Sequence, residues 1–421
     1  MRETAISGAN GLPRMAFAAL FATTLATAIG NTGLISVMPA VGRQLGISDF
    51  LIASIFSLSA LMWAIFSPYW AARSDRRGRK PFILVGLGGF IFSMLGCGLV
   101  VLAATAPLAG PTVIFMAFLV IRSSYGMFGS ASAAAAQAYV ADHSEGARRV
   151  RAIATLGGAL SLGTILGPAL APFLILPPVG LSAPMFFFAA GGVAILLLAA
   201  IALPADGPPK LSSRRVERTG SIWGDQRVRP FLLYGFTVSS AQAANTYTLG
   251  FQVIDRLGLP PMEAQGAIGL AMVTGAAAGL LAQWGLIAMA GMMPRALLRW
   301  GAALALGGNM LIVMLPGYGA LVAAFALTSL GYGLARPGFS AGASLAAPDE
   351  GQGAVAGAVG SIAGASIVIS PILAVALYEI APSGPFIVLG GLMAAMLGYC
   401  WTSPSLAENR VRSDAIVSCE R

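Results

Sequence analysis

Long runs of apolar residues, separated by short polar segments, follow one another along the whole chain. A helix of about 20 apolar residues spans the roughly 30 Å hydrocarbon core of a bilayer. The runs are continuous rather than alternating between apolar and polar positions, which favours helices over the strands of a membrane barrel. The pattern predicts an all-α integral membrane protein with twelve transmembrane helices, at residues 16–40, 51–71, 82–104, 112–139, 152–176, 184–204, 230–254, 266–290, 296–315, 319–346, 353–378 and 384–403.

The composition agrees with a membrane protein. Of the 421 residues, 57% are hydrophobic and only 10% are charged, and the mean hydropathy is +0.81. Soluble domains carry about 25% charged residues. The polar segment 1–15 precedes a full-length span, so we expect it to be a short N-terminal tail rather than a cleaved signal.

The longest polar stretch divides the chain into two parts. Residues 205–229, rich in Pro, Ser and Arg, separate six predicted spans at 16–204 from six at 230–403, and a tail follows at 404–421. This organisation predicts two pseudo-symmetric six-helix halves joined by a cytoplasmic linker. Transporters built from paired repeats bind their substrate between the repeats, near the middle of the bilayer.

The basic residues predict the orientation of the chain. Of the 25 Lys and Arg, all except Arg43, Arg122, Arg256 and Arg336 lie in the tails or in the loops on the same side as the termini. Because cytoplasmic loops carry an excess of Lys and Arg, we expect both termini in the cytoplasm and the chain in a cell membrane, such as a bacterial inner membrane. The formal net charge of +9 is then an orientation signal, and nucleic-acid binding has little support.

Several kinds of chemistry lack the residues that they need. Cys97, Cys400 and Cys419 are too few and too scattered for a metal cluster or a disulfide framework. The single histidine, His143, lies in a predicted cytoplasmic loop, so a histidine metal site or a buried Ser/His pair cannot form. No G-x-x-x-x-G-K-[ST] segment occurs. We therefore expect no enzyme, no cofactor, no metal site and no direct use of ATP.

The segment between the second and third predicted helices carries the most specific motif. It reads A-A-R-S-D-R-R-G-R-K at residues 71–80. It resembles the G-x-L-A-D-R-x-G-R-[RK] motif that the major facilitator superfamily of transporters carries at this place, with matches at Asp75, Arg76, Gly78, Arg79 and Lys80. Ala71 and Arg73 depart from the motif. The resemblance implies the major facilitator fold and a cytoplasmic latch between the halves that breaks when the protein opens inward.

Two more segments extend this resemblance. Residues 138–149 look like the loop after the fourth helix in antiporters of the superfamily, so Asp142 and one of Arg148 or Arg149 are expected to join the latch. R-S-S-Y-G at 122–126 resembles R-x-x-Q-G of the proton-driven antiporters, with Tyr125 in place of glutamine. There the resemblance implies a role for Arg122 in proton coupling. The alternative is a structural arginine that donates to backbone carbonyls.

A motif in the fifth predicted span favours export. G-T-I-L-G-P at 163–168 is similar to G-x-x-x-G-P-x-x-G-G, which is found in exporters of the superfamily and is generally missing from its importers. Small residues at Gly163 and Gly167 allow a neighbouring helix to approach closely, and Pro168 bends the span. Ala171 and Pro172 depart from the final glycine pair of the motif.

Acidic residues are missing from the interiors of the predicted spans. In the drug antiporters that this chain resembles, the first helix usually carries a carboxylate that titrates during transport, and alignment puts Thr27 at one such position. Proton exchange here would then use an acid at a helix end or an ionisable group of the substrate.

Polar residues at helical spacing predict the lining of a substrate cavity. They are Thr27, Asn31, Tyr125, Asn245, Tyr332 and Arg336. For each uncharged one, an interhelical hydrogen bond is at least as good an interpretation. Arg122 and Arg336 give the interior two positive charges and no evident negative one, which suggests a substrate with anionic character, such as a carboxylate-bearing metabolite or a siderophore.

The sequence therefore predicts a monomeric secondary active transporter that exports a small molecule by alternating access, in exchange for protons. The substrate is either such an anion or a drug-like compound. Two alternatives stay open. One is an importer or facilitator of an organic anion, and the other is a transporter-like protein that acts as a sensor and does not transport.

Overall fold

The computed structural model describes residues 13–104, 110–144, 146–204, 222–287, 292–347, 352–403 and 406. The first half consists of α1 (Arg14–Gln44), α2 (Asp49–Arg77), α3 (Lys80–Ala103), α4 (Pro111–Ser124), a π-helical turn (Tyr125–Gly129), α5 (Ser130–Asp142), α6 (Gly146–Leu170), a 3₁₀ turn (Ala171–Leu174) and α7 (Ala183–Ala202). The second half consists of α8 (Arg229–Leu257), α9 (Gln265–Leu280), a π-helical turn (Leu281–Leu286), α11 (Pro294–Met314), α12 (Tyr318–Ala346), α13 (Gln352–Ile380) and α14 (Gly384–Thr402). Most of the predicted linker and tails lies outside the described residues.

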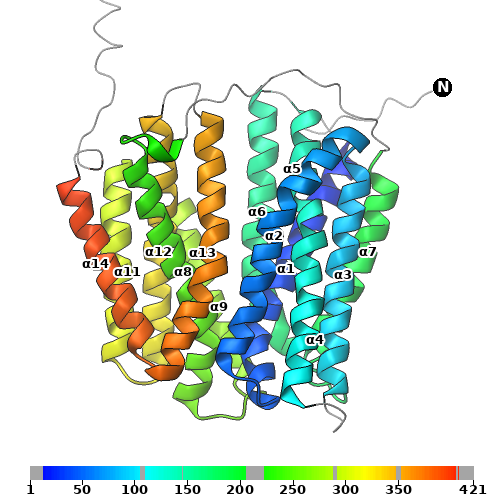
Figure 1. Cartoon of the computed structure of the whole chain (residues 1–421), viewed down its shortest axis with the longest axis horizontal. Helices are drawn as coiled ribbons and strands as arrows, with labels where there is room; N and C mark the ends of the chain where they lie inside the picture. Colours follow the sequence, from blue (N-terminus) through cyan, green and yellow to red (C-terminus); the bar gives the residue numbers. More distant parts are fainter. Residues whose placement is uncertain are drawn as a thin grey trace, which may run out of the picture.

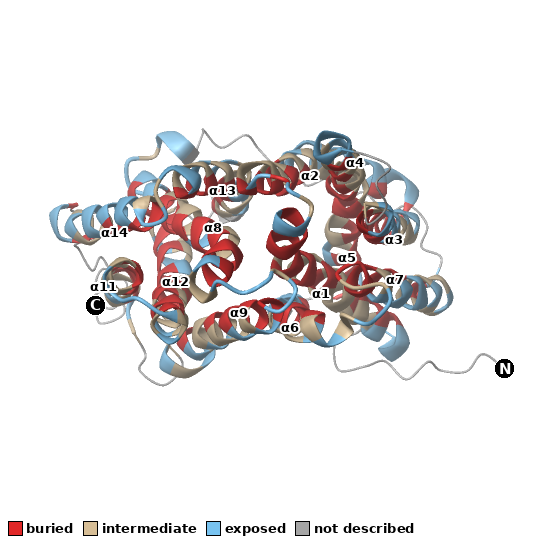
Figure 2. Ribbon diagram, turned by 90° about the horizontal axis from the view of Figure 1, so that it is seen from below, coloured by how far each residue is buried: buried red, intermediate tan, exposed pale blue. Residues whose placement is uncertain are grey.

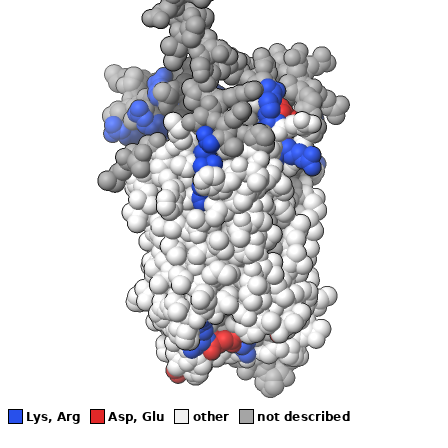
Figure 3. Space-filling view, turned by 90° about the vertical axis from the view of Figure 1, so that its left-hand side faces the viewer, with Lys and Arg blue, Asp and Glu red and all other residues white. Residues whose placement is uncertain are grey.

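The helices agree with the twelve predicted spans, and the fourth span comprises α4, the π-helical turn and α5. Among the described residues, eleven helical segments are long and apolar enough to cross a membrane. Helix α8 is outside this set because of its more polar composition, not its length. Figure 3 shows a broad uncharged belt on one face of the molecule, with charged side chains gathered toward the two ends. The chain is a multi-pass membrane protein.

The two halves repeat the same packing (Figure 1). In each half the first helix packs on the fifth, α1 on α6 and α8 on α13, and the third packs on the sixth, α3 on α7 and α11 on α14. The contacts between the halves repeat as well, since the second helix of each half packs on the fifth of the other, α2 on α13 and α9 on α6. The two-half fold therefore rests on matching contacts as well as on span count.

Buried residues lie on the helix faces that meet one another, and exposed apolar residues cover the perimeter (Figure 2). Phe173, Ile201 and Ile380, in helices or a 3₁₀ turn of the predicted spans or next to them, are more than 75% exposed. Such side chains face lipid in a membrane protein, where lipid replaces water as the solvent of the outer surface. We call the end of the bundle that carries Arg77, Arg79 and Lys80 the basic end, and the other end the opposite end.

Two helices change their geometry near the predicted motifs. The π-helical turn begins at Tyr125, within the R-S-S-Y-G motif at 122–126, and Trp70 Nε1 donates to the carbonyl of Met127 in this turn at 2.6 Å. Turns of this kind interrupt α-helices frequently at functional sites. In the fifth span, the α-helix ends at Leu170, two residues after Pro168, and continues as a 3₁₀ turn. Pro172, the second residue of this turn, has no N–H to donate to the carbonyl of Pro168, which accounts for the end of the α-helical pattern here.

Candidate transport site and gates

The turn at the basic end is formed by Gly78. Helix α2 ends at Arg77 and α3 begins at Lys80, and Gly78 between them has φ 89° and ψ 165°. This backbone conformation is open to glycine and strained for other residues. The expected tight turn is therefore present, and it brings Arg79 back toward the end of α2.

Arg79 is the centre of an ion-pair cluster at this turn. Its Nε donates to Asp142 Oδ2 at 2.8 Å, its Nη1 donates to Ser74 Oγ at 2.8 Å, and Nη1 also pairs with Asp75. The side chain is 7% exposed. Burial acts to lower the pKa of Arg79, but the hydrogen bonds to Asp142 and Asp75 outweigh it, and the pKa is raised above its usual value. The guanidinium is charged at every physiological pH.

This cluster lies within the first half. It joins the end of α2, the start of α3 and the end of α5, and so the expected link of Asp142 to the motif is present. Arg76 and Arg148 are exposed, and the structure brings neither into an ion pair with a described acid. Arg149 Nε donates to the carbonyl of Ser144 at 2.9 Å. The ion pairs of this cluster that join described residues do not reach the second half, to which the predicted latch extends.

Lys80 has a different role from the arginines. Its Nζ donates to the carbonyls of Ala200 at 2.7 Å and Leu203 at 2.5 Å, at the end of α7. A cation at this place satisfies carbonyls that have no partner within the helix and interacts favourably with the negative end of its dipole. The last motif residue therefore fixes α7 to the start of α3.

The exporter motif packs against α1. A Cβ on Gly163 would lie 2.4 Å from the Cβ of Ala28, and a Cβ on Gly167 would lie 2.5 Å from the carbonyl oxygen of Ile29. Thr32 Oγ1 donates to the carbonyl of Gly163 at 3.0 Å. Glycine at both positions is therefore required for the close approach of α6 to α1.

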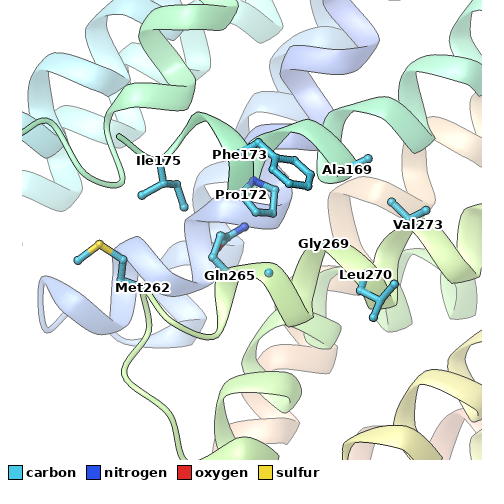
Figure 4. Close-up of a pocket in the computed structure, with 10 residues that line it drawn as sticks. Ala169, Pro172, Phe173, Ile175, Met262, Gln265, Gly269, Leu270 and Val273 are labelled. Carbon is cyan, nitrogen blue, oxygen red and sulfur yellow. The ribbon is translucent and has the colours of Figure 1, made fainter. Parts of the chain in front are cut away.

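The same motif reaches the second half through Pro168. A Cβ on Gly269 of α9 would lie 2.7 Å from the carbonyl oxygen of Pro168 and 2.9 Å from Cγ of Pro172. Toward the opposite end, α6 and α9 enclose a groove of about 550 Å³, which Figure 4 shows with Pro172 and Phe173 above Gln265 and Leu270. None of the six predicted cavity residues lines this groove.

Ion pairs at the opposite end join the halves, and sequence reasoning did not find them. Arg43 at the end of α1 pairs with Asp49 at 2.6 Å and with Asp255 of α8 at 2.9 Å. Tyr378 donates to Asp255 at 2.6 Å, and the backbone N–H of Phe50 donates to Glu379 at 2.9 Å. We call these residues the opposite-end cluster. A signal existed, since Arg43 and Arg256 are the two cations in predicted loops on the side away from the termini.

The hydrogen bonds between described residues of the two halves are all on the opposite-end side of the bundle. Besides the opposite-end cluster, Gln265 Nε2 donates to the carbonyl of Ser36 at 3.1 Å. Figure 1 shows the ribbons of the two halves converging toward that end. The described hydrogen bonds between the halves therefore lie at that end, whereas the ion pairs of Arg79 with Asp75 and Asp142 at the basic end lie within the first half.

Arg122 is buried inside the first half, with 2% of its surface exposed. Its Nη2 donates to Asn31 Oδ1, and its guanidinium lies over the rings of Tyr125 at 4.5 Å and Phe56 at 5.5 Å. Two of its nitrogens, Nε and Nη1, have no hydrogen-bond acceptor. The predicted residues Asn31 and Tyr125 are thus both in contact with Arg122.

Asn245 and Tyr332 bind one another in the second half. Asn245 Nδ2 donates to the hydroxyl of Tyr332 at 2.9 Å and to Asn309 Oδ1 at 3.2 Å, and all three side chains are buried. Asn309 was missed because it lies singly in an apolar span. For Asn245 and Tyr332, the interhelical hydrogen bond is what the structure contains.

The remaining two predicted cavity residues, Thr27 and Arg336, differ in their surroundings. Thr27 Oγ1 donates to the carbonyls of Thr23 at 2.8 Å and Thr24 at 3.1 Å within its own helix. Arg336 is exposed at about the middle of α12, and no described acid pairs with it. The two interior arginines are therefore without a described counter-ion.

The comparison with known families agrees with this fold and these motifs. The sequence profile described as Major Facilitator Superfamily matches residues 20–293, which is more than half of the chain. The chain belongs to the major facilitator superfamily. It is therefore a membrane transporter by family, with the two-half fold described above.

Relatives of this major facilitator protein include proteins named for drug resistance. Tetracycline resistance protein, class B, of Escherichia coli is 31% identical over 153 residues, 36% of this chain and 35% of that protein. Multidrug resistance protein 2 of Bacillus subtilis (strain 168) is 26% identical over 400 residues, 91% of this chain and 93% of that protein. The match thus covers about a third of the tetracycline protein and nearly all of the multidrug protein.

Solved structures share the fold of this major facilitator protein. A bacterial homologue of the human lysosomal transporter Spinster, in an inward-facing and unoccupied conformation, has a TM-score of 0.71 and 14% identity, over 91% of each chain. The human organic anion transporter MFSD10 (TETRAN) has a TM-score of 0.63 and 20% identity, over 92% of this chain and 99% of the other. At these identities the likeness concerns the fold alone.

Proposed function

We propose that this chain is a secondary active exporter that moves a small molecule by alternating access in exchange for protons. The observation that carries this proposal is the distribution of contacts between the halves. Among the described residues, they are joined by the opposite-end cluster and by the packing of Pro168 on α9, whereas the ion pairs of Arg79 with Asp75 and Asp142 at the basic end lie within the first half. A transporter that alternates access needs one closed and one open end at a time.

The direction of transport follows from the exporter motif and from the orientation of the chain. The excess of Lys and Arg at the basic end supports a cytoplasmic position for that end. Halves that meet at the opposite end are consistent with a state that takes up its substrate from the cytoplasmic side. The matched tetracycline and multidrug resistance proteins support export.

The exchanged proton is assigned to helix-end carboxylates. Asp75 and Asp142 at the basic end, and Asp49 and Asp255 at the opposite end, are the acids that contact gate arginines. A carboxylate that loses an arginine partner binds a proton more tightly. Of these described pairs, Arg43 with Asp255 is the one that joins the two halves, so opening of the opposite end separates Asp255 from its arginine.

Intact cells test export directly. Cells that overproduce the chain are loaded with tetracycline, with ethidium, or with carboxyfluorescein supplied as its diacetate ester, and the retained dye or drug is followed over time. We expect faster loss of at least one compound than in cells with an empty vector, and a protonophore should stop the difference. If each of the three compounds is retained as long as in cells with the empty vector, the result counts against the proposal.

The opposite-end cluster yields a conformational prediction. In Arg43→Gln, the amide cannot replace the two ion pairs to Asp49 and Asp255, so the end at which the halves meet should open more often. Spin labels at Gln44 and Leu259, in a variant without the native cysteines, report the separation of the halves there. We expect a shift of the distance distribution to longer values. An unchanged distribution would show that Arg43 does not hold this end closed.

Arg336 yields a prediction on substrate charge. Because it is an exposed cation in the middle of α12, Arg336→Ala should reduce the export of carboxyfluorescein by roughly fivefold or more, by the loss of about 1 kcal/mol of attraction for the anion. Ethidium, a cation, should be unaffected. The matched control is Arg227→Ala, which removes an exposed arginine that pairs with Asp225 outside the membrane. Carboxyfluorescein export that equals that of the wild type would remove Arg336 from the substrate path.

A further inference from the structure

Arg122 is a buried cation without a counter-ion in the described chain. It is 2% exposed, and the only hydrogen bond of its side chain among described residues goes from Nη2 to the neutral side chain of Asn31. The described ion pairs involve Arg43, Arg79 and Arg227, and none of the described acids pairs with Arg122. An unpaired charge at this depth is strongly unfavourable unless another group compensates it.

The contacts around the guanidinium compensate it only in part. Tyr125 and Phe56 present ring faces at 4.5 and 5.5 Å, which attract the positive charge but accept no conventional hydrogen bond. Nε and Nη1 remain without an acceptor. A structural arginine that donates to the carbonyls of a bent helix would have these donors satisfied, so that interpretation does not account for Arg122. What Nε and Nη1 lack is a hydrogen-bond acceptor, and an anion would be the strongest acceptor for a guanidinium.

The position of Arg122 suggests where this anion comes from. Phe56, which covers the guanidinium, is in edge-to-face contact with Tyr247 of the second half, with ring centroids 5.3 Å apart. This aromatic pair joins α2 to α8 across the boundary between the halves. Arg122 therefore lies one ring away from the boundary that transport must open and close, and a ligand bound between the halves is within reach of it.

We propose that Arg122 is the anion-binding residue of the transport site, and that the substrate is an amphipathic organic anion. The carboxylate or sulfonate of this anion accepts from the unused donors of Arg122, and its apolar body packs against Phe56, Tyr125 and Tyr247. The proposal rests on the transport function proposed above, and it specifies the substrate class. A cationic substrate would be repelled by Arg122 at the same place.

In the conformation described here, Nε and Nη1 are closed off from solvent. The anion reaches them when a covering ring turns aside, so the substrate completes the site as it binds. Without the substrate, Asn31 and the two rings cap the charge. The empty site is thus closed against small inorganic ions, and an anion gains entry only if its apolar body replaces the ring contacts.

Binding to the purified full-length protein in detergent is the first test. The probes are 2-naphthoate and 2-naphthalenesulfonate, each compared with its uncharged amide, and titration calorimetry gives Kd. We expect the wild type to bind at least one anion roughly tenfold or more tightly than the matching amide, which corresponds to about 1.4 kcal/mol. Arg122→Gln should lose that preference, and Arg122→Lys should retain part of it.

The sharpest variant is Asn31→Asp. It replaces the side-chain NH₂ by an oxygen and keeps the shape of the side chain. The new carboxylate lies beside Arg122 as an internal counter-ion. We expect this variant to fold at least as stably as the wild type in thermal unfolding, and to lose the preference for the anion by roughly tenfold, because the internal carboxylate occupies the guanidinium. A merely structural Arg122 would show the gain in stability with unchanged binding.

Equal binding of the anions and amides to the wild type, including no binding of either, would overturn the proposal, as would an unchanged anion preference in Asn31→Asp. These outcomes are independent of the proposed export. If ethidium is exported and the anions do not bind, export stands and the assignment of Arg122 is wrong. If the anions bind and no compound is exported, the binding site stands and export is wrong.

Discussion

Gly167→Ala is expected to lower the free energy of unfolding by about 1–3 kcal/mol, the usual cost of overpacking a well-packed contact. The added Cβ would lie 2.5 Å from the carbonyl oxygen of Ile29 and 2.7 Å from the backbone nitrogen of Gly33. Because both are backbone atoms of α1, the two helices have to move apart. Thermal unfolding of the purified protein in detergent measures the loss, and export of the dye should fall with it.

The matched control for this substitution lies in the same helix. A Cβ on Gly157 of α6 would meet no atom within 4 Å. Gly157→Ala should therefore leave stability unchanged or raise it by up to about 1 kcal/mol, through the higher helix propensity of alanine. Equal melting temperatures for Gly167→Ala and the wild type would show that α6 does not depend on this close approach to α1.

Arg79→Met is expected to reduce transport by roughly tenfold or more, since each ~1.4 kcal/mol removed from one conformation shifts an equilibrium tenfold. The substitution leaves Asp75 and Asp142 without their shared partner and releases α5 from the turn between α2 and α3. Asp75 is 56% exposed and Asp142 is 32% exposed, so water compensates part of the loss. We expect the free energy of unfolding to fall by about 1–3 kcal/mol.

Arg77→Met is the control for Arg79→Met. Arg77 is exposed two positions earlier, and the described ion pairs do not include it. Arg77→Met tests whether the loss of any positive charge at this turn is sufficient to reduce transport and stability. If the Arg79 cluster matters as proposed, Arg79→Met lowers both transport and the melting temperature clearly more than Arg77→Met does. Equal effects of the two variants would contradict this role of the cluster.

The sequence predicted the fold well because the signals are local. Spans follow from the length of apolar runs, the turn at Gly78 follows from the motif, and the close approach at Gly163 and Gly167 follows from residue size. Each of these depends on neighbours within a few positions in the chain. The pairing of halves was predicted from span count alone, and the repeated helix contacts now support it.

The sequence predicted the site less completely because its contacts are distant in the chain. Arg43 and Asp255 are 212 positions apart, and no local pattern pairs them. Helical spacing placed Asn245 and Tyr332 on polar faces, but spacing carries no information on depth, and both proved to be buried with Asn309. For Arg122, the absence of interior acids was visible in the sequence, whereas its two unused donors required the structure.

The central claim is that this major facilitator protein exchanges an exported small molecule for protons. Everted membrane vesicles test it most directly, because their outer surface is the cytoplasmic face and an imposed pH gradient is followed with a fluorescent dye. We predict that 2-naphthalenesulfonate, tetracycline or ethidium partly collapses the gradient in vesicles with the wild type, and that the collapse is absent with Arg79→Met. A gradient that stays unchanged on addition of all three compounds would contradict the account.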